Sequence, residues 1–263
     1  MKFALVNNVR CEASPKLSGQ CPACSADMIA KCGTKRIWHW SHRGERNCDP
    51  WWETETEWHR AWKNLFPPEC QEIHHIDERG ERHIADIKTE SGLVIEVQHS
   101  AISSAKQDAR EAYYKQMVWV VDATRLKRDL PRLANGERLH LTHMGREYFH
   151  TRAPEECFPD AWLNRKVPVL FDHQALAGFH EGKPAENSRL WCLFPGRARG
   201  HAVAAIVSRK LFAEITRQRA ELFPVKQIMQ TVTEGLAPRP NPTPPRTPMP
   251  PRYRGWRRRY ARF

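Results

Sequence analysis

The sequence predicts an α/β fold with a small metal-binding module before it and a disordered tail after it. Paired cysteines and histidines fall within the first 50 residues, and helical and strand patterns alternate after them. Proline and arginine dominate residues 239–263. We therefore divide the chain into a zinc-binding module at 1–50, an α/β core at 51–124, a second α/β region of unknown role at 125–236 and a tail at 237–263.

Four side chains able to bind a metal ion lie in two close pairs near the start of the chain. Two residues separate Cys21 from Cys24, and two separate His39 from His42. Zn²⁺ binds four sulfur or nitrogen donors in a tetrahedron, and a hairpin turning near Gly33 would bring the two pairs together. The pattern therefore predicts a structural zinc in a ribbon-like module.

Other arrangements of this module stay open. Cys32 or Cys48 could replace one of the ligands, or the four side chains could be reduced thiols and surface histidines without a metal. We expect Trp38 and Trp40 to pack around the site and keep it dry. Because no signal peptide or membrane span is evident, we expect a cytoplasmic protein whose eight cysteines stay reduced.

A helix is predicted from Glu55 to Phe66, because large apolar residues recur there at helical spacing. Thr54 and Glu57 match a capping box at its start. Three side chains four residues apart follow one border of the apolar stripe: Glu55, His59 and Lys63. Taken alone, this row indicates a solvated ladder of charges rather than a site.

Strands and one more helix are predicted in the rest of the core and beyond it. In the core, the strands are Gln71–Ile76, Glu81–Lys88, Gly92–Gln98 and Met117–Val121, and the helix is Ser103–Gln116. In the region 125–236, we expect strands at Val167–Phe171 and Leu190–Phe194 and a long helix at Ala202–Leu222. We find no chemical motif in that second region.

Two acids and an amide interrupt the predicted buried strands. Glu96 and Gln98 point to one face of their strand, and a tight turn places Asp86 roughly opposite Glu96. Two half-buried carboxylates about 5 Å apart either share a proton or hold a cation. Hard oxygen ligands suit Mg²⁺ or Mn²⁺, so the pair predicts a metal site. The alternative is a structural role in which Arg82 or Lys88 pairs with the acids.

Several motifs, in one order over roughly the first half of the chain, resemble the CoiA competence-protein family. They are Cys21-Pro-Ala-Cys24, His39-Trp-Ser-His42, Glu55-x3-His59-x3-Lys63, Ala85-Asp86, Ile95-Glu96-Val97-Gln98 and Arg110-x2-Tyr113. The acid pair also resembles the D-x(n)-E-x-K motif of the PD-(D/E)XK nuclease superfamily. Gln98 stands at the usual lysine position, as glutamine does in other members of this kind.

The resemblance implies a restriction-endonuclease-like core, with a mixed sheet flanked by helices in the order αβββαβ. It implies a Mg²⁺-dependent deoxyribonuclease in which Asp86 and Glu96 hold the metal. The other implied catalytic residues are Gln98, Glu55 and His59, and the implied substrate-binding residues are Lys63, Arg110 and Tyr113. The implied setting is the processing or recombination of incoming DNA in a bacterial cell, with recombination proteins as possible partners.

The charge of the chain is concentrated in its tail. Net charge is +12, and residues 239–263 contain eight arginines, four aromatic residues and no acid. Arginine and aromatic side chains together suit phosphate contacts and base stacking, so we expect a DNA partner, single-stranded or branched. A solvated extension without function is the alternative for the tail. For the whole chain, the rival hypothesis is a zinc-containing DNA-binding or adaptor protein with an inactive nuclease core.

Overall fold

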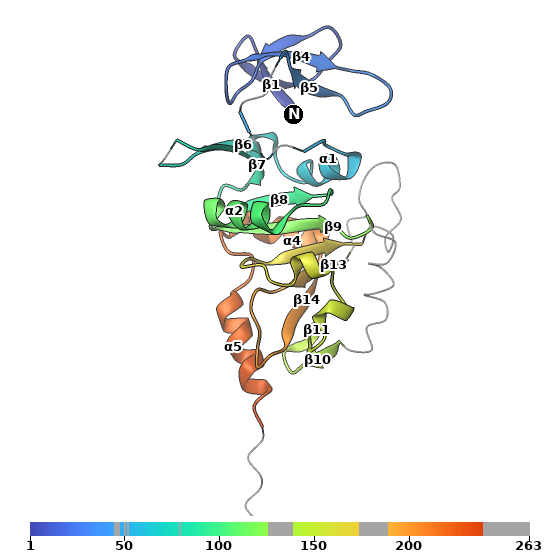
Figure 1. The fold of residues 1–263 in the computed structure, drawn as a ribbon, viewed down its shortest axis with the longest axis vertical. Coiled ribbons are helices and arrows are strands. Elements are labelled where there is room, and N and C mark those ends of the chain that lie inside the picture. The colour runs from blue at the N-terminus through green and yellow to red at the C-terminus, as the bar shows by residue number, and fades with distance from the viewer. Residues whose placement is uncertain are drawn as a thin grey trace, which may run out of the picture.

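The computed structural model describes residues 1–44, 48–49, 51, 53–78, 80–125, 139–173 and 189–238. Two sheets follow one another along the long axis of the molecule, and the N-terminal sheet lies beyond the β6 edge of the larger one (Figure 1). No helix in these ranges is both long enough and apolar enough to cross a bilayer. The predicted tail from residue 239 onward lies outside the described residues.

The N-terminal sheet has five antiparallel strands in the order β2-β1-β3-β4-β5. Its strands are β1 (Phe3–Val6), β2 (Val9–Glu12), β3 (Ser18–Gln20), β4 (Asp27–Lys31) and β5 (His39–His42). The expected hairpin near Gly33 is confirmed, because β4 and β5 pair antiparallel on either side of it. Trp40 packs in the small core of this sheet, whereas Trp38 is 49% exposed, so the expectation that both indoles surround the metal site is wrong for Trp38.

The larger sheet has nine strands in the order β10-β11-β14-β13-β12-β9-β8-β7-β6. They are β6 (Gln71–Ile76), β7 (Arg82–Lys88), β8 (Val94–Gln98), β9 (Met117–Asp122), β10 (His140–Thr142), β11 (Gly145–Thr151), β12 (Val169–Asp172), β13 (Arg189–Leu193) and β14 (Ala202–Ser208). β9 runs parallel to β8 and β12, and the other pairs are antiparallel. The prediction of an α/β fold with a mixed sheet is therefore confirmed.

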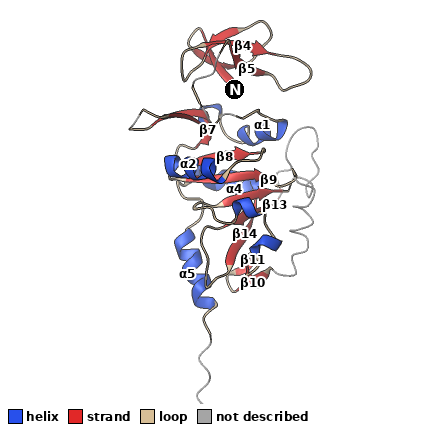
Figure 2. Ribbon diagram, in the orientation of Figure 1, coloured by secondary structure: helices blue, strands red, loops and turns tan. Residues whose placement is uncertain are grey.

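Helices cover both faces of this sheet (Figure 2). They are α1 (Glu57–Lys63), α2 (Ser104–Tyr114), α4 (Arg209–Gln218) and α5 (Val225–Gly235), with 3-10 turns at Pro68–Cys70, Pro154–Glu156 and Asp160–Trp162. Apolar side chains of α1, α4 and α5 share one core cluster, and those of α2 and the Asp160–Trp162 turn share the other. The element order α1-β6-β7-β8-α2-β9 is the order predicted for residues 51–124.

Helix α1 begins two residues later than predicted. Thr56, with extended backbone angles, caps the helix by accepting a hydrogen bond from the backbone N–H of His59 at 3.2 Å. Thr54 precedes Glu57 by three residues, just as Thr56 precedes His59, but Thr54 lies outside the helix. The predicted capping box is therefore wrong. Glu55 therefore precedes the helix, and helical spacing does not determine where its side chain points.

The long helix predicted from Ala202 to Leu222 is also wrong at its start. Residues 202–208 form strand β14, which pairs with β11 and β13, and α4 begins only at Arg209. The segment Ala-Val-Ala-Ala-Ile-Val-Ser is mostly buried, and small and β-branched residues suit a strand covered on both faces. Ser208 ends the strand and caps the helix through the backbone N–H of Leu211.

The region 125–236 extends the same sheet as the core, because β10–β14 continue the strand order that starts with β6. Asp172, at the end of β12, joins the two regions. Its fully buried Oδ2 accepts the indole N–H groups of Trp58 and Trp62, each at 2.9 Å, and pairs with Arg209 at 2.5 Å. Helix α1 is thus fixed to a residue more than 100 positions later in the chain.

Candidate functional site

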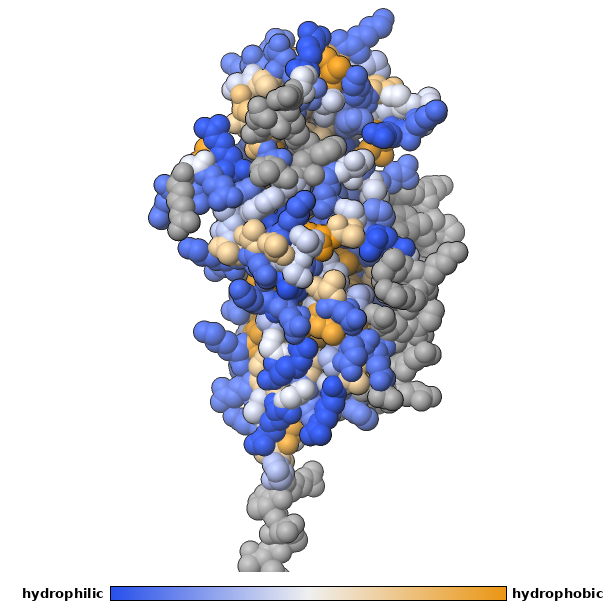
Figure 3. Space-filling view, viewed as in Figure 1, coloured by the Kyte–Doolittle hydropathy of each residue, from blue (hydrophilic) through white to orange (hydrophobic). Residues whose placement is uncertain are grey.

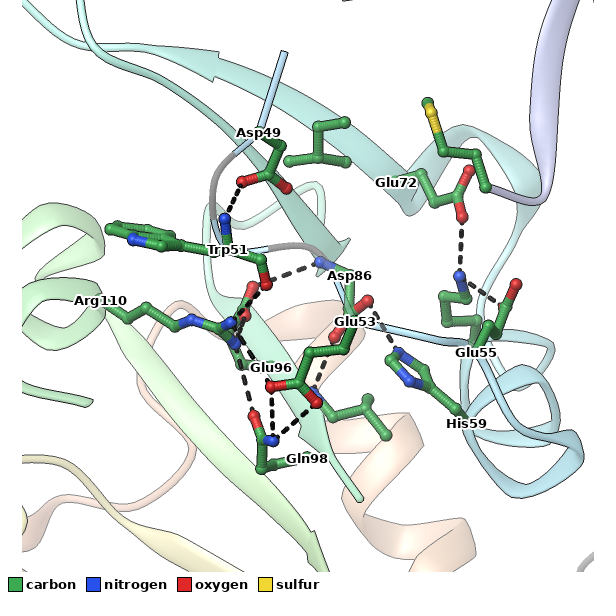
Figure 4. A pocket seen from close by; sticks show the side chains of 14 residues that line it. Asp49, Trp51, Glu53, Glu55, His59, Glu72, Asp86, Glu96, Gln98 and Arg110 are labelled. Carbon is green, nitrogen blue, oxygen red and sulfur yellow. Dashed lines mark hydrogen bonds and ion pairs between the residues drawn. The ribbon is translucent and has the colours of Figure 1, made fainter. Parts of the chain in front are cut away.

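A cavity of about 60 Å³ lies between the N-terminal module and strands β6, β7 and β8 (Figure 4). Among the described residues, six carboxylates line it: Asp49, Glu53, Glu55, Glu72, Asp86 and Glu96. The basic side chains of His59, Lys63 and Arg110 and the amide of Gln98 line it as well. The structure thus brings the five predicted catalytic residues and two of the predicted substrate-binding residues around one cavity.

The acid pair lies where β7 and β8 separate. The two strands pair at Ile87–Ile95 and Lys88–Val94, and one residue further Asp86 and Glu96 face each other. There the side chain of Asp86 accepts the backbone N–H of Val97 at 3.0 Å. The backbone N–H of Asp86 in turn donates to Glu96 Oε1 at 3.3 Å. Side chains replace the strand ladder here, so a space opens beside both carboxylates.

Burial and neighbouring charges shift the pKa values of the two carboxyl groups in opposite directions. Burial would raise the pKa of Asp86, but the charge and hydrogen bond of His59 and the charge of Lys63 hold it below its ordinary value. His59 Nε2 lies 2.8 Å from Asp86 Oδ1. Burial and the charge of Asp86 raise the pKa of Glu96 to about 8, against the opposing charge of Arg110. The pair therefore holds one proton, or a cation, near neutral pH.

Arg110, on α2, reaches the acid pair from the other side. Its Nη1 donates to Glu96 Oε2 at 3.0 Å and contacts Gln98 Oε1 at 3.5 Å, and its Nη2 donates to the carbonyl of Trp51 at 2.7 Å. Gln98 turns its Nε2 toward Glu53, 2.8 Å from each carboxylate oxygen. The alternative to a metal site was a structural pair between the acids and Arg82 or Lys88, and the structure places Arg110 beside Glu96.

Glu55 and Lys63 form a second charged group in the cavity. Lys63 Nζ lies 2.6 Å from Glu55 and 2.8 Å from Glu72, and Arg60 pairs with Glu55 at 2.7 Å. Burial would raise the pKa of Glu55, but the charges of Lys63 and Arg60 hold it well below its usual range. Burial would lower the pKa of Lys63, but the charges of Glu72 and Glu55 raise it instead. Both groups are therefore charged and already paired.

Tyr113 does not line this cavity. Its hydroxyl donates to the carbonyl of Glu81 at 3.0 Å, and its ring packs edge-on against Trp51 and His83. Trp51 also provides the carbonyl that Arg110 contacts. The structure therefore places Tyr113 behind the site, where it packs against a segment that holds Arg110.

Sequence reasoning missed Glu53 and Glu72. Glu53 lies in the extended segment before α1, two residues from Glu55, where alternate side chains point to the same side of the chain. Because the helix was predicted to start at Glu55, this alternation was not recognised. Glu72 has φ +47, and the β6–β7 pairing skips it together with Asp86, while the register on both sides of the gap stays the same. Its carboxylate accepts the backbone N–H groups of Lys2 and Phe3 at 2.8 and 3.2 Å. It thereby fixes the N-terminal module to the core.

A separate Cys/His cluster lies in the N-terminal module. Its members are Cys21, Cys24, His42 and Cys48, whose ligand atoms all lie within 4.8 Å of one another. Among the described residues this is the only group of three or more Cys, His, Asp or Glu side chains gathered so closely. The acidic cavity does not meet that criterion.

The distances in this cluster fit a tetrahedral ion. The two sulfurs of Cys21 and Cys48 lie 3.8 Å apart, and His42 Nε2 lies 3.4 and 3.5 Å from Cys24 and Cys48. Zinc bonds of about 2.3 Å to sulfur and about 2.0 Å to nitrogen, at tetrahedral angles, separate the ligands by about 3.8 and 3.5 Å. The backbone N–H of Ala23 donates to Cys21 Sγ. The cluster could therefore hold zinc.

His39 is not a member of this cluster, so the predicted ligand set is wrong at that position. Residues three apart on a strand point to opposite faces, so His39 and His42 cannot both face the cysteines from β5. His39 Nδ1 contacts the carbonyl of Ile37 instead, at 2.8 Å. Cys48, which the sequence left as an alternative ligand, takes the fourth position.

Comparison with known proteins identifies the N-terminal module. Residues 15–50 match the family model described as "Competence protein CoiA, N-terminal domain", and so confirm the CoiA-like resemblance for this segment. The match includes all four members of the Cys/His cluster. No curated protein and no solved structure matches the chain significantly.

Proposed function

We propose that the chain is a metal-dependent deoxyribonuclease of the PD-(D/E)XK type, with its site in the acidic cavity around Asp86 and Glu96. The proposal rests on one observation: the two carboxylates face each other in a buried space where β7 and β8 separate. A protein that only bound nucleic acid would gain nothing from this arrangement, because buried negative charge repels phosphate.

Asp86 and Glu96 would hold Mg²⁺ or Mn²⁺. The raised pKa of Glu96 supports this assignment. It results from burial and from the charge of Asp86, and the positive charge of Arg110 offsets these effects only in part. Mg²⁺ commonly takes only one or two carboxylates and completes its shell with water and phosphate oxygens. When bound, the ion would lower the pKa of a water molecule and neutralise charge on the phosphate.

The other residues of the cavity have separate roles in this proposal. Hydrolysis joins the hydroxide part of water to phosphorus and gives the remaining proton to the leaving oxygen. His59, hydrogen-bonded to Asp86, orients that carboxylate and can hold a proton. Arg110 places a positive charge beside Glu96, which compensates for glutamine at position 98. Glu55 fixes Lys63 rather than binding the metal, because two cations already occupy it.

We further propose that the Cys/His cluster holds a structural zinc ion through Cys21, Cys24, His42 and Cys48. The small core of this module contains few large apolar residues, and metal binding would stabilise it directly. The match to a competence-protein domain suggests a competence-related function. We propose DNA as the partner from that resemblance and from the arginine-rich sequence 239–263. Recombination proteins as further partners and a bacterial cytoplasmic setting are proposed from the resemblance alone.

Cleavage assays on purified full-length protein test the nuclease proposal. Single-stranded, duplex and branched DNA are incubated with Mg²⁺, with Mn²⁺ and with neither. We expect metal-dependent cleavage that Asp86→Asn and Glu96→Gln abolish. Glu90→Gln, which changes an exposed acid in the β7–β8 turn, is the matched control and should cleave as the unaltered protein does. Equal cleavage by Asp86→Asn would overturn the site assignment.

An adaptor that binds DNA without cleaving it is the second candidate. Arg110 already pairs with Glu96, and the ligand atoms in the acidic cavity are less closely gathered than those of the Cys/His cluster. Both observations fit a core in which an internal ion pair replaced the metal. Isothermal titration with Mg²⁺ and Mn²⁺ separates the candidates, because only the nuclease should lose a binding event upon Asp86→Asn.

A further inference from the structure

A groove runs over the surface between the N-terminal module and the start of α1. Its volume is about 430 Å³, and it lies between the β4–β5 loop and the extended segment Thr54–Thr56. Binding pockets for small ligands span roughly 300–1,000 Å³, so a single nucleotide unit fits this volume. The groove is thus large enough for a ligand, although neither the fold nor the acidic cavity requires it.

The groove continues toward the acidic cavity. A smaller cavity of about 40 Å³ lies between them and shares Arg36, Ile37, Thr54 and Glu55 with the groove. It shares Met1 and Glu55 with the acidic cavity. The three spaces therefore adjoin, and Glu55 lines all of them.

Arg60 holds the two banks of the groove together. Its Nη2 donates to the carbonyl of Trp38 on the β4–β5 loop at 3.2 Å, and its Nε donates to Glu55 Oε1 at 2.8 Å. Because one guanidinium joins both banks, the groove is a fixed feature of the interface between module and core.

The loop bank of the groove is basic and aromatic. Lys35 and Arg36 are exposed, and Trp38 is 49% exposed. Among the described residues, the other large apolar side chains with comparable exposure are Val9, Ile76 and Leu211, none of which is aromatic. On the face that Figure 3 shows, the surface is largely hydrophilic, with small separated apolar patches. Cations and an exposed ring together match phosphate and base.

We propose that this groove binds single-stranded nucleic acid and directs it toward the acidic cavity. The inference deepens the proposed nuclease function and rests on it for the direction of the strand. Trp38 would stack on a base, and Lys35 and Arg36 would contact the phosphates on either side. Glu57, exposed on the opposite bank, opposes binding.

The dimensions favour a single strand over a duplex. The side chains of Glu96 and Asp86 are 5% and 21% exposed, and the cavity around them is about 60 Å³. A base-paired helix cannot bring its phosphates to carboxylates this deeply buried without a large opening of the interface. A single strand needs a smaller opening, because it is narrower than a duplex and its unpaired nucleotides turn freely about the backbone, and its exposed bases are available for stacking on Trp38.

Binding of fluorescein-labelled oligodeoxythymidylate to the full-length protein, without added Mg²⁺ or Mn²⁺, tests the groove. Trp38→Ala should weaken binding about tenfold, because stacking on an aromatic ring contributes roughly 1–3 kcal/mol per base. Lys35→Ala with Arg36→Ala should reduce the salt slope by about 1.4, at about 0.7 per phosphate contact. Glu57→Gln should tighten binding. Leu211→Ala and Lys16→Ala, exposed apolar and basic positions outside the groove, are the matched controls.

Two outcomes would overturn the groove proposal: unchanged binding in both loop variants, or an equal loss of affinity for duplex DNA. Photo-cross-linking with 5-bromodeoxyuridine in the oligonucleotide should attach it to Trp38, and this readout is insensitive to binding elsewhere on the chain. Retained zinc content shows that the variants are folded.

Hydrolysis of bis(p-nitrophenyl) phosphate separates this proposal from the nuclease proposal, because that small diester needs only the acidic cavity. If the unaltered protein cleaves neither diester nor DNA while Trp38→Ala loses binding, the nuclease proposal fails and the groove stands. If both are cleaved and Trp38→Ala leaves the Michaelis constant for DNA unchanged, the groove fails and the nuclease stands. If the groove is correct, Trp38→Ala raises that constant and leaves diester hydrolysis unchanged.

Discussion

Arg110 Nη1 lies 3.0 Å from Glu96 Oε2, so the positive charge that pairs with Glu96 comes from helix α2 rather than from strand β8. A basic residue at position 98, two positions after Glu96 on β8, would keep its place beside Glu96 because both belong to the same strand. A guanidinium on a neighbouring helix instead depends on the packing between that helix and the sheet. The local charge balance of the cavity is therefore a property of tertiary structure.

Removing Arg110 should expose this dependence. At pH 9, above the raised pKa of Glu96, Arg110→Gln leaves its buried carboxylate without a partner, and such losses cost about 3–5 kcal/mol. Urea unfolding measures the change. In a Glu96→Gln background the same substitution should cost much less, because the uncompensated charge is gone. If the two substitutions have additive effects, the ion pair contributes nothing to stability.

Stability should depend on pH through Glu96. Its folded pKa of about 8 exceeds the value of about 4.3 expected for an unfolded chain, so the folded state binds this proton more tightly. The resulting stability is complete below about pH 4.3 and is lost as the pH rises toward 8. Relative to the unaltered protein, Glu96→Gln should therefore gain stability between pH 5 and 8. The test is urea unfolding without added Mg²⁺ or Mn²⁺, with Glu90→Gln as control. A pH-independent difference would contradict the raised pKa.

The Cys/His cluster predicts which substitutions release zinc. The unaltered protein should contain about one zinc ion per chain, and Cys48→Ser and His42→Ala should lose it and loosen the module. His39→Ala and Cys32→Ser should retain the metal, because neither side chain belongs to the cluster. Elemental analysis with limited proteolysis measures both effects. Zinc loss from His39→Ala would restore the ligand set predicted from the sequence.

Asp172 should be far more important for stability than a surface acid with the same kind of partner. Asp172→Asn removes the charge that Arg209 needs and disturbs the acceptor of two indole N–H groups, at a cost of about 3–5 kcal/mol. The matched control is Asp108→Asn, which breaks the exposed pair with Arg165 and should cost less than about 1 kcal/mol. Similar unfolding midpoints for both variants would contradict the structural role of Asp172.

Local patterns predicted the order of elements from α1 to β9 and the neighbouring positions of Asp86 and Glu96. Both depend on short-range periodicity: side chains alternate along a strand, and a tight turn defines which residues face each other. The errors arose where two local solutions competed. Thr54 and Thr56 have equivalent capping spacing, and the choice between them moved Glu55 out of the helix.

Long-range packing determined the rest of the site. Strand parity could have excluded His39 once β5 was recognised, but nothing local indicated that Cys48 would return to the cluster. Residues 202–208 became a strand because β11 and β13 were available to pair on both sides. The role of Glu72 has no local sequence signal either, because its partners Lys2 and Phe3 lie 70 and 69 positions away in the chain.

The hydrogen bonds from Trp58 and Trp62 to Asp172 also bear on the order of events during synthesis. A ribosome releases α1 more than 100 residues before it releases the carboxylate that accepts both indoles. Until then, the indole N–H groups of both tryptophans lack this acceptor, whereas every described residue that lines the acidic cavity lies at or before Arg110 and has already been synthesised. In the order of synthesis, the residues of the site therefore precede the contact that connects α1 to β12.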